Sequence, residues 1–322
     1  MIKEIIRHLY CIELPLPKNP LKSINCYVIK GKDRNLIIDT GMNREECKAV
    51  LFPALKELDI DLQRTDLFIT HLHADHFGLS GDLATDSSIC YFNRVETAIV
   101  KEASHWGNFL QIFIENGFPE SVLQDSMAKH PGVLYSPSRL VEITPVDDGQ
   151  VIEVGDYKLQ CIETPGHSPG HMCLYDAAKK LLFSGDHILF DITPNISYWP
   201  EMKDALRSYM ASLDKVSGLD VTRVLPAHRS PWHSHRERIE ELKIHHRHRL
   251  DECIAALQEG DMTAYEVAPY ITWKIECSDW EQFPIAQKFF AVGETIAHLH
   301  YLETDKMITR YTEEGQVYFA LA

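Results

Sequence analysis

Hydrophobic and polar positions in the first part of the chain predict a sheet that leads into a histidine-rich loop. Strand-like runs at residues 25–29 and 35–39, joined by a short turn, predict a hairpin of a half-buried sheet. Apolar residues at helical spacing predict a helix over residues 45–58, and a short buried strand over 67–70 runs straight into His71. The predicted order is therefore strand, helix, strand and histidines.

The middle of the chain predicts helix and then a second group of strands. Residues 93–130 place aromatic and aliphatic side chains at helical spacing. The strand-like runs that follow lie at residues 150–154, 157–164, 171–175, 181–184 and 223–225. Because the strands form two groups, each followed by helix, the pattern favours an αββα sandwich over a doubly wound parallel sheet. The Gly-rich motifs that bind dinucleotides or phosphates are absent from the sequence.

From Ser234 onwards the sequence becomes more charged and predicts a small additional module. Three helices and a closing hairpin are predicted over residues 236–257, 263–270, 285–302 and 306–321. Such an arrangement is typical of a winged-helix-like domain. We therefore predict an α+β protein with a catalytic domain over residues 1–235 and a winged-helix-like C-terminal domain over residues 236–322.

The composition is that of a folded, acidic, globular protein. The 322 residues include 32 Lys and Arg against 47 Asp and Glu, a formal net charge of −15, and 45% are hydrophobic. This content supports a buried core, and the acidic balance argues against binding DNA or RNA through bulk electrostatics. No signal peptide and no run near the roughly 18 apolar residues of a membrane span is found. We expect a cytoplasmic protein without a membrane partner, whose eight cysteines are reduced and mostly buried.

The largest local group of potential metal ligands lies in residues 71–76, which read His-Leu-His-Ala-Asp-His directly after the predicted buried strand. Two imidazoles two residues apart at a strand end can point to the same side and chelate one ion. The Asp and the third His then turn towards a neighbouring position. Imidazole with carboxylate suits Zn, Mn, Fe or Co. A chance His-rich surface turn is the alternative interpretation of this stretch taken alone.

Three more candidate ligands each end a strand-like run, which makes chance a poor explanation. His167 follows Thr-Pro-Gly, Asp186 follows Ser-Gly, and His228 follows Leu-Pro-Ala. A glycine directly before His167 and before Asp186 lets the backbone turn sharply, so that the next side chain faces the cleft. We therefore predict a metal site built from four separate strand ends.

These motifs, in this order, resemble the metallo-β-lactamase superfamily of binuclear metallohydrolases over about residues 20–232. The resemblance implies two divalent ions, with Zn preferred and Fe and Mn as alternatives. It implies that one metal is held by His71, His73 and His167, that the other is held by Asp75, His76 and His228, and that Asp186 bridges them. It also implies that Asp39-Thr40-Gly41 supports the ligand loops without binding metal.

The resemblance to binuclear hydrolases also implies a mechanism. Two adjacent cations supply a metal-bridging hydroxide as nucleophile and polarise the scissile oxygen, so that no Ser or Cys nucleophile is required. Asp75 is the candidate catalytic residue, because it is placed to take a proton of the bridging water and to pass it to the leaving group.

Two further stretches point to a subfamily. Residues 164–171, Thr-Pro-Gly-His-Ser-Pro-Gly-His, resemble glyoxalase II, the hydroxyacylglutathione hydrolases. Residues 185–196 together with the C-terminal module resemble bacterial glyoxalase II-like proteins with a β-lactamase-associated winged-helix domain. This resemblance implies a small-molecule acyl substrate, either a thioester of the acylglutathione type or a related ester or lactone.

Other functional classes compete with this hydrolase. A metal-dependent phosphodiesterase or ribonuclease is the alternative, but the net charge and the single Lys in helix 285–302 make nucleic acid an unexpected partner. The same lack of positive charge argues against a nucleic-acid-binding module. The C-terminal domain is therefore expected to form one wall of the active site or to mediate self-association into a homo-oligomer. Iron-dependent redox relatives either replace the residue at His73 by Glu or use only the first-metal ligands. Retention of Asp75, His76 and His228 therefore favours hydrolysis.

Several residues outside this ligand set are candidates for the pocket or its support. His171 and His187 are predicted to support the ligands or to approach substrate, and Tyr198-Trp199-Pro200 to line the pocket. The helical segment with His105, Trp106, Phe109, Phe113 and Phe118 is predicted either to cover the cleft or to pack as ordinary core. A basic cluster is either a solvated helix face or an anion site near the cleft mouth. Its members are His233, His235, His245, His246, His248, Arg229, Arg236, Arg238, Arg247 and Arg249.

Overall fold

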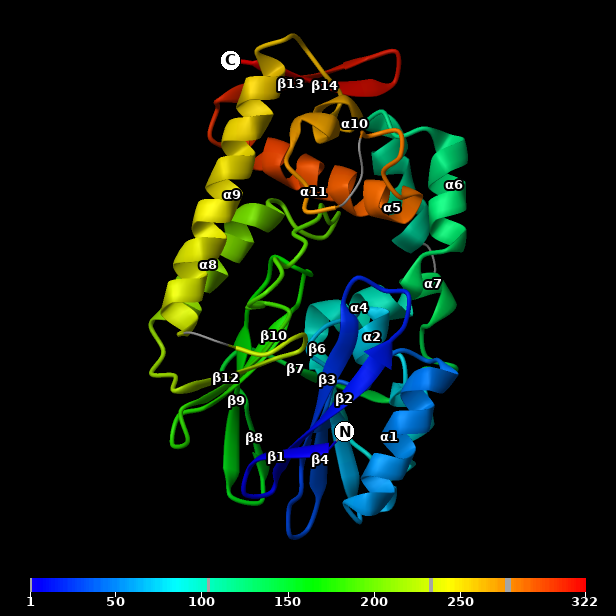
Figure 1. Ribbon diagram of the computed structural model, residues 1–322, viewed down its shortest axis with the longest axis vertical. Helices are drawn as coiled ribbons and strands as arrows, with labels where there is room; N and C mark the ends of the chain where they lie inside the picture. The colour runs from blue at the N-terminus through cyan, green and yellow to red at the C-terminus, as the bar shows by residue number, and fades with distance from the viewer. Residues whose placement is uncertain (1, 103–104, 232–233, 276–278) are drawn as a thin grey trace.

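Two β-sheets stacked face to face form the centre of the molecule in a computed structural model that describes residues 2–102, 105–231, 234–275 and 279–322 (Figure 1). In the larger sheet the strands are adjacent in chain order: β1 (Ile2–Ile6), β2 (Leu9–Leu16), β3 (Lys22–Ile29), β4 (Asn35–Ile38), β5 (Thr65–Phe68), β6 (Cys90–Asn93) and β7 (Ile143–Val146). The strands from β1 to β4 pair antiparallel, and those from β4 to β7 pair parallel.

The smaller sheet contributes the remaining strands of the sandwich. Its spatial order is β12 (Arg223–Pro226), β11 (Leu181–Gly185), β10 (Met172–Asp176), β9 (Tyr157–Glu163) and β8 (Val151–Val154). Buried apolar side chains of both sheets meet between them, among them Phe68, Leu159 and Leu174, and Tyr27 meets Phe183 edge to face at 5.4 Å between ring centroids. Removal of this apolar surface from water holds the two sheets together.

Helices cover the outer faces of both sheets, which completes four αββα layers. On the larger sheet α1 (Glu45–Glu57) packs against β2, and on the smaller sheet α8 (Ala205–Ser217) buries Tyr209 and Leu213. The connection from β5 to β6 contains α2 (Ala74–Phe77) and α3 (Ser80–Leu83), and the 3-10 turn Leu62–Arg64 precedes β5. Between β6 and β7 lie α4 (Arg94–Lys101), α5 (His105–Glu115), α6 (Glu120–Ala128) and α7 (Pro131–Leu134).

The C-terminal region lies across one end of the sandwich (Figure 1). It comprises α9 (His235–Leu257), α10 (Ala264–Val267), the 3-10 turn Ala268–Tyr270, α11 (Ile285–Thr304), β13 (Ile308–Glu313) and β14 (Gln316–Leu321). Capping boxes at Ser234 and Thr263 satisfy the free N–H groups that begin α9 and α10. In Figure 1, α11 runs between α9 on one side and α5 and α6 on the other, and Phe289 of α11 stacks on Phe113 of α5 at 4.4 Å.

The structure confirms the predicted αββα sandwich with an additional C-terminal region. The hairpin, the helix over residues 45–58 and the strands after residue 150 all form. The helix predicted over residues 93–130 is wrong as one unit, because the chain turns after Lys101, at Gly117 with φ +87° and at Pro119. The strands β1, β2, β6 and β7 and the helix α8 were not predicted. The winged-helix assignment and the boundary at residues 235/236 stay predictions.

Two smaller expectations from the sequence can be compared with the structure. The seven cysteines among the described residues are free thiols, and all but the half-buried Cys11 are buried; Cys277 lies outside the described residues. No helix within the described part of the chain has the length and apolar character needed to cross a membrane.

A buried ion pair joins α9 to α11, and Asn195 connects this pair to the sandwich. The guanidinium of Arg249 donates to the carboxylate of Glu294, and the side-chain N–H of Asn195, in the loop after β11, donates to the same carboxylate at 2.8 Å. Arg249 is 8% exposed and Glu294 3%. Removing one member of such a pair leaves the other charge buried without compensation.

We therefore predict that Glu294→Ala lowers the free energy of unfolding by about 3–5 kcal/mol, as is typical when one partner of a buried pair is removed. Glu303→Ala, on the same helix, is the matched control, because the Glu303–Arg310 pair is partly exposed and is worth less than about 1 kcal/mol. Urea denaturation of the three proteins measures both values. Equal losses in the two variants would contradict the importance given to the buried pair.

Candidate metal centre

The predicted ligands gather where four strands of the two sheets end. His71, His73, Asp75 and His76 follow β5. His167 follows β9, Asp186 directly follows β11 and His228 follows β12. Six of these seven side chains are almost fully buried, and His73 is partly exposed. Polar side chains buried at this density require partners or a bound ion.

Three imidazole nitrogens meet at the first part of this cluster. His71 Nε2 lies 2.9 Å from His73 Nδ1. His167 Nε2 lies 3.2 Å from His71 Nε2 and 3.0 Å from His73 Nδ1. Nitrogens about 2.0–2.1 Å from one zinc ion would lie at such mutual distances.

The hydrogen bonds on the far sides of two rings leave their near nitrogens as potential metal ligands. His167 donates its Nδ1–H to the carbonyl oxygen of Asn195 at 2.8 Å, so its Nε2 carries a lone pair. Thr70 donates its single hydroxyl hydrogen to Asp39, which leaves the hydroxyl oxygen to accept Nδ1–H of His71 at 3.1 Å. His71 Nε2 therefore also carries a lone pair. Two facing lone pairs repel each other unless a cation lies between them.

A second ligand set forms beside the first. Asp75 Oδ2, His76 Nε2 and His228 Nε2 are buried without a hydrogen-bond partner. Asp75 Oδ2 lies 3.3 Å from His228 Nε2 and 3.8 Å from His76 Nε2. The other nitrogens of the two rings are held, since His76 donates to Asp39 at 2.7 Å and His228 donates to the carbonyl of Ser23 at 2.6 Å. These second contacts orient both rings towards a common point.

Asp186 faces both sets at once. Its Oδ1 lies 3.5 Å from His228 Nε2 and 3.6 Å from His76 Nε2, while Oδ2 lies 3.6 Å from His167 Nε2. Its backbone N–H donates to Nε2 of His171 at 3.1 Å. The other ring nitrogen of His171 therefore carries the proton and donates to Thr164 at 2.8 Å. His171 is thus a support for Asp186, as the sequence suggested.

Two glycines allow these turns. Gly185 has φ +50° and Gly166 has φ +144°. A Cβ at Gly185 would lie 2.6 Å from Nε2 of His171, and one at Gly166 would lie 2.4 Å from Cβ of Tyr209. The positive φ and the lack of room for a Cβ therefore require glycine directly before His167 and directly before Asp186.

Comparison with known proteins agrees with this arrangement. The profile of the metallo-beta-lactamase superfamily matches residues 19–228, and that of the metallo-beta-lactamase-like C-terminal domain matches residues 250–322. The chain belongs to the metallo-β-lactamase superfamily.

Relatives within this superfamily include metallo-hydrolases. The chain is 28% identical to the probable metallo-hydrolase YqjP of Bacillus subtilis, over 91% of this chain and 92% of that protein. It is 28% identical to the human acyl-coenzyme A thioesterase MBLAC2, over 63% of this chain and 72% of that protein. A crystal structure of a metallo-beta-lactamase family protein from Thermus thermophilus matches 99% of this chain and all of that chain, with a TM-score of 0.82 and 27% identity.

The two ligand sets of this metallo-β-lactamase fold differ in their affinity for protons. Burial and then the neighbouring rings lower the pKa of His71 well below its usual value, and burial followed by His167 lowers the pKa of His73 to about 3. In the second set burial acts in the same direction, but nearby carboxylates outweigh it and raise the pKa of His76 well above its usual value and that of His228 as well. The first set is therefore neutral at pH 7, whereas the second attracts protons.

Glu96 is a buried residue beside the predicted ligands that the sequence did not reveal. Its buried carboxylate on α4 accepts from the backbone N–H of Leu72 at 2.6 Å, from the Ser168 hydroxyl at 2.5 Å and from the Gly170 N–H at 2.8 Å. It thereby joins the two loops that carry the first ligand set. Burial raises the pKa of Glu96 to about 7, and these three donors act against that rise. Nothing in its sequence neighbourhood distinguishes it from a solvated helix residue.

The structure separates the pocket-lining candidates. Trp199 stacks on His73 at 6.1 Å between centroids, and its indole N–H donates to the carbonyl of His167 at 3.2 Å. The Phe109 ring packs against the Trp199 ring at 5.7 Å between centroids, which places α5 beside Trp199. Phe109 itself, like Phe113 and Phe118, is buried in the hydrophobic core, which is the core-packing alternative for this segment. The side chains of His105 and Trp106 lie outside the described residues.

Two other aromatic candidates have structural surroundings. His187 packs edge-on against Tyr209, whose hydroxyl donates to the carbonyl of His187 at 2.9 Å. Tyr198 packs against His300 of the C-terminal region at 5.0 Å. Both therefore stabilise the surroundings of the ligand loops.

Glu96→Gln is predicted to weaken metal binding about 10–100-fold, the usual effect of losing a supporting contact around a metal site. The amide NH2 of Gln would face an N–H or O–H donor on one of the two loops, so the loops would separate. Competition with a chromophoric chelator measures the affinity. Glu57→Gln, an exposed change on α1, is the control. Unchanged affinity in Glu96→Gln would refute the role given to this residue.

Proposed function

We propose that the chain hydrolyses small acyl thioesters at a centre of two divalent ions, with Zn preferred and Fe and Mn as alternatives. The observation that carries the proposal is the convergence of candidate ligand atoms into two adjacent sets that Asp186 faces from both sides. In the second set, Asp75 Oδ2, His76 Nε2 and His228 Nε2 are buried without a hydrogen-bond partner. His71, His73 and His167 would hold one ion, and Asp75, His76 and His228 the other. Neutral imidazole and carboxylate form a donor set that suits these metals.

When bound, two such cations supply hydroxide at neutral pH and polarise the scissile carbonyl. The protein residues orient the ligands and handle the proton. Asp39 and the carbonyl of Ser23 fix the tautomers of His76 and His228. Asp75 presents a buried carboxylate oxygen without a hydrogen-bond partner, and we assign to it the transfer of the proton to the leaving thiolate.

Two buried thiols, in β9 and β10 of the smaller sheet, are poor nucleophiles, which supports a mechanism without a cysteine nucleophile. Burial raises the pKa of Cys173 to about 12, and burial together with Asp148 raises that of Cys161 to about 12. Neither thiol forms appreciable thiolate at neutral pH, and the thiolate is the nucleophilic form.

Two observations favour a thioester over other acyl substrates. The sequence of residues 164–171 resembles glyoxalase II, which supports an acylglutathione substrate. The human relative is named as an acyl-coenzyme A thioesterase, which supports an acyl-CoA substrate. Both substrates present the same reacting group, a thioester carbonyl with a thiolate leaving group, so the proposed centre serves either.

The central prediction is metal-dependent thiol release from S-lactoylglutathione, an acyl-CoA or both, by protein loaded separately with Zn, Mn and Fe. Asp186→Ala removes the carboxylate that faces both ligand sets. It should reduce the rate by more than the roughly 10–100-fold that loss of an outer partner costs. Asp191→Ala, an exposed change shortly after Asp186, should leave the rate unchanged.

Full activity in Asp186→Ala would contradict the metal assignment. If the loaded protein releases no thiol from any thioester, the thioesterase proposal fails. The alternative substrates are then lactones, other esters and phosphodiesters.

The opposite pKa shifts of the two sets predict that acid removes the ions in sequence. Ligand nitrogens must be deprotonated to bind metal. The raised pKa values of His76 and His228 therefore make protons compete in the second set, while His71 and His73 stay free of protons until far lower pH. Equilibrium dialysis at decreasing pH, followed by metal analysis, should show one ion per chain lost before the other. Loss of both ions in one step would contradict this order.

A further inference from the structure

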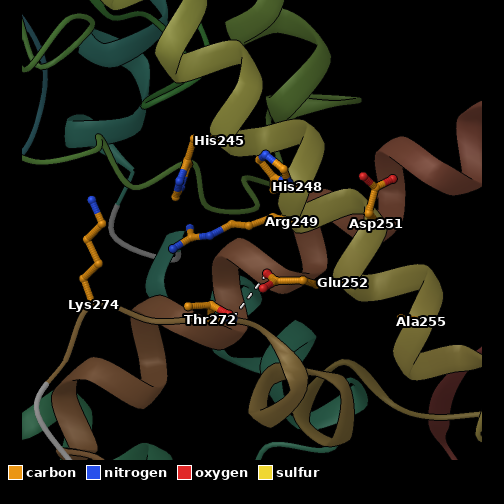
Figure 2. A pocket seen from close by; sticks show the side chains of 8 residues that line it. All are labelled: His245, His248, Arg249, Asp251, Glu252, Ala255, Thr272 and Lys274. Carbon is orange, nitrogen blue, oxygen red and sulfur yellow. Dashed lines mark hydrogen bonds between the residues drawn. The ribbon is translucent and has the colours of Figure 1, made fainter.

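A second cluster of chemistry lies in the C-terminal region, away from the proposed metal centre. A cavity of about 510 Å³ opens between α9 and the segment around Thr272, a volume within the roughly 300–1,000 Å³ of small-molecule sites. Its lining includes the basic side chains of His245, His248, Arg249 and Lys274 (Figure 2). Three of these belong to the basic cluster noted in the sequence.

The prediction that this cluster is a solvated helix face is wrong for three of its members. His235 is 2% exposed, His246 is fully buried and Arg249 is 8% exposed, because α9 packs against α8 and α11. Arg247 and His248 do face solvent, and His233 lies outside the described residues. The other interpretation that the sequence suggested is an anion site.

Two buried nitrogen atoms of the cavity residues lack partners. Arg249 uses its terminal nitrogen for Glu294, but its Nε has no hydrogen-bond partner, and neither has Nε2 of His245. The guanidinium is held in place by stacking over Trp273 at 4.3 Å. A buried donor without an acceptor is costly, so a bound acceptor would be favoured here.

The charges around the cavity favour an anion at one end. In the view of Figure 2, His245, Arg249 and Lys274 lie towards one side, whereas Asp251 and Ala255 lie towards the other. Glu252 is engaged with the backbone N–H of Thr272 at 3.2 Å. Burial, followed by the positive charges of Arg249 and Lys274, lowers the pKa of His245 to about 3. Arg249 and Lys274 are therefore the main charged groups that act on this ring.

A cation is a poorer occupant of this region. His245, His246 and Glu294 have the spacing of metal ligands. However, one oxygen of Glu294 accepts from Arg249 and the other from Asn195. A metal ion would have to displace Arg249 or lie against its positive charge, which Coulomb repulsion disfavours.

The cavity is connected to the metal centre through direct contacts. Arg249 binds Glu294, Glu294 binds the side chain of Asn195, and the carbonyl of Asn195 orients His167. Arg238, nearer the N-terminus of α9, donates to the carbonyls of Leu189 and Ile192 in the loop after Asp186. The cavity thus lies on the same helix, α9, that contacts the loop after Asp186.

We propose that this cavity binds the phosphate-bearing end of an acyl-CoA substrate. The inference rests on the proposed thioesterase function and names the carrier that the enzyme recognises. In acyl-CoA the phosphates lie at the end remote from the thioester, so their site must lie apart from the reacting carbonyl. Lys274 and Arg249 supply positive charge, and His245 and His248 supply further nitrogen donors. Glutathione carries no phosphate and would not use this site.

The test compares two substrates with the same acyl group in the metal-loaded, full-length protein. One is the acyl-CoA, and the other is the acyl thioester of N-acetylcysteamine, which lacks phosphates. Lys274→Ala should raise KM for acyl-CoA roughly tenfold, the effect of losing one charge-assisted contact. It should leave kcat and the KM for the short thioester unchanged. Lys274→Arg should restore KM.

Controls separate this effect from a loss of folding. Lys32 is exposed and lies in the turn between β3 and β4, far from Lys274 in the sequence. Lys32→Ala should leave both KM values unchanged. His245→Ala should act in the same direction as Lys274→Ala. If Lys274→Ala and His245→Ala both leave KM for acyl-CoA unchanged, or raise KM for both substrates alike, the inference is overturned.

Calorimetry keeps the inference testable if the proposed function fails. Where no thioester is cleaved, CoA, pantetheine and inorganic phosphate are titrated into the wild type and Lys274→Ala. Binding of CoA but not pantetheine, weakened in the variant, would support the phosphate site. Binding of CoA that the variant leaves unchanged, no binding of CoA, or binding of inorganic phosphate without CoA would overturn the assignment.

Discussion

Seven polar side chains converge at one edge of the sandwich with their ligand atoms turned towards each other, and the rest of the structure serves to hold them there. Left alone, such atoms would repel or would be drawn back to water, because buried polar groups without partners are costly. The chain opposes this with contacts on the far side of the rings: Asp39 on His76, Ser23 on His228 and Asn195 on His167. The far nitrogens are used by the protein so that the near nitrogens remain available. Each of these rings thus uses one nitrogen for a hydrogen bond within the protein and presents the other as a potential metal ligand.

The C-terminal region is part of this support. The buried pair of Arg249 and Glu294 connects α9 to α11, and Asn195 joins that pair to the loop whose carbonyl orients His167. The stacked rings of Phe113 and Phe289 make the inserted helices and α11 share one apolar core. A region that packs in this way can supply a wall for substrate, and its cavity beside Arg249 and Lys274 is the proposed site for the phosphates of an acyl-CoA.

The sequence predicted the local motifs better than the contacts between distant segments. His71 to His76, His167, Asp186 and His228 could be recognised because each follows a strand and two follow glycine, so local pattern and local geometry coincide. Glu96 could not be recognised, because its role depends on two loops that approach α4 only in the folded chain. For the same reason the charged sequence of α9 predicted solvent, although packing against α11 buries His246 and Arg249. The helix α8 was missed although Leu206, Tyr209, Leu213 and Val216 recur at helical spacing, which is the pattern of an amphipathic helix.

The most direct test of this account is anomalous diffraction at the absorption edge of the metal in crystals of the loaded protein. The account predicts two peaks about 3.5–4 Å apart. One should lie within about 2.0–2.3 Å of the nitrogens of His71, His73 and His167, and the other beside Asp75, His76 and His228. An oxygen of Asp186 should lie next to each peak. A single peak, or peaks away from these side chains, would contradict the claim that the fold is organised around a two-metal centre.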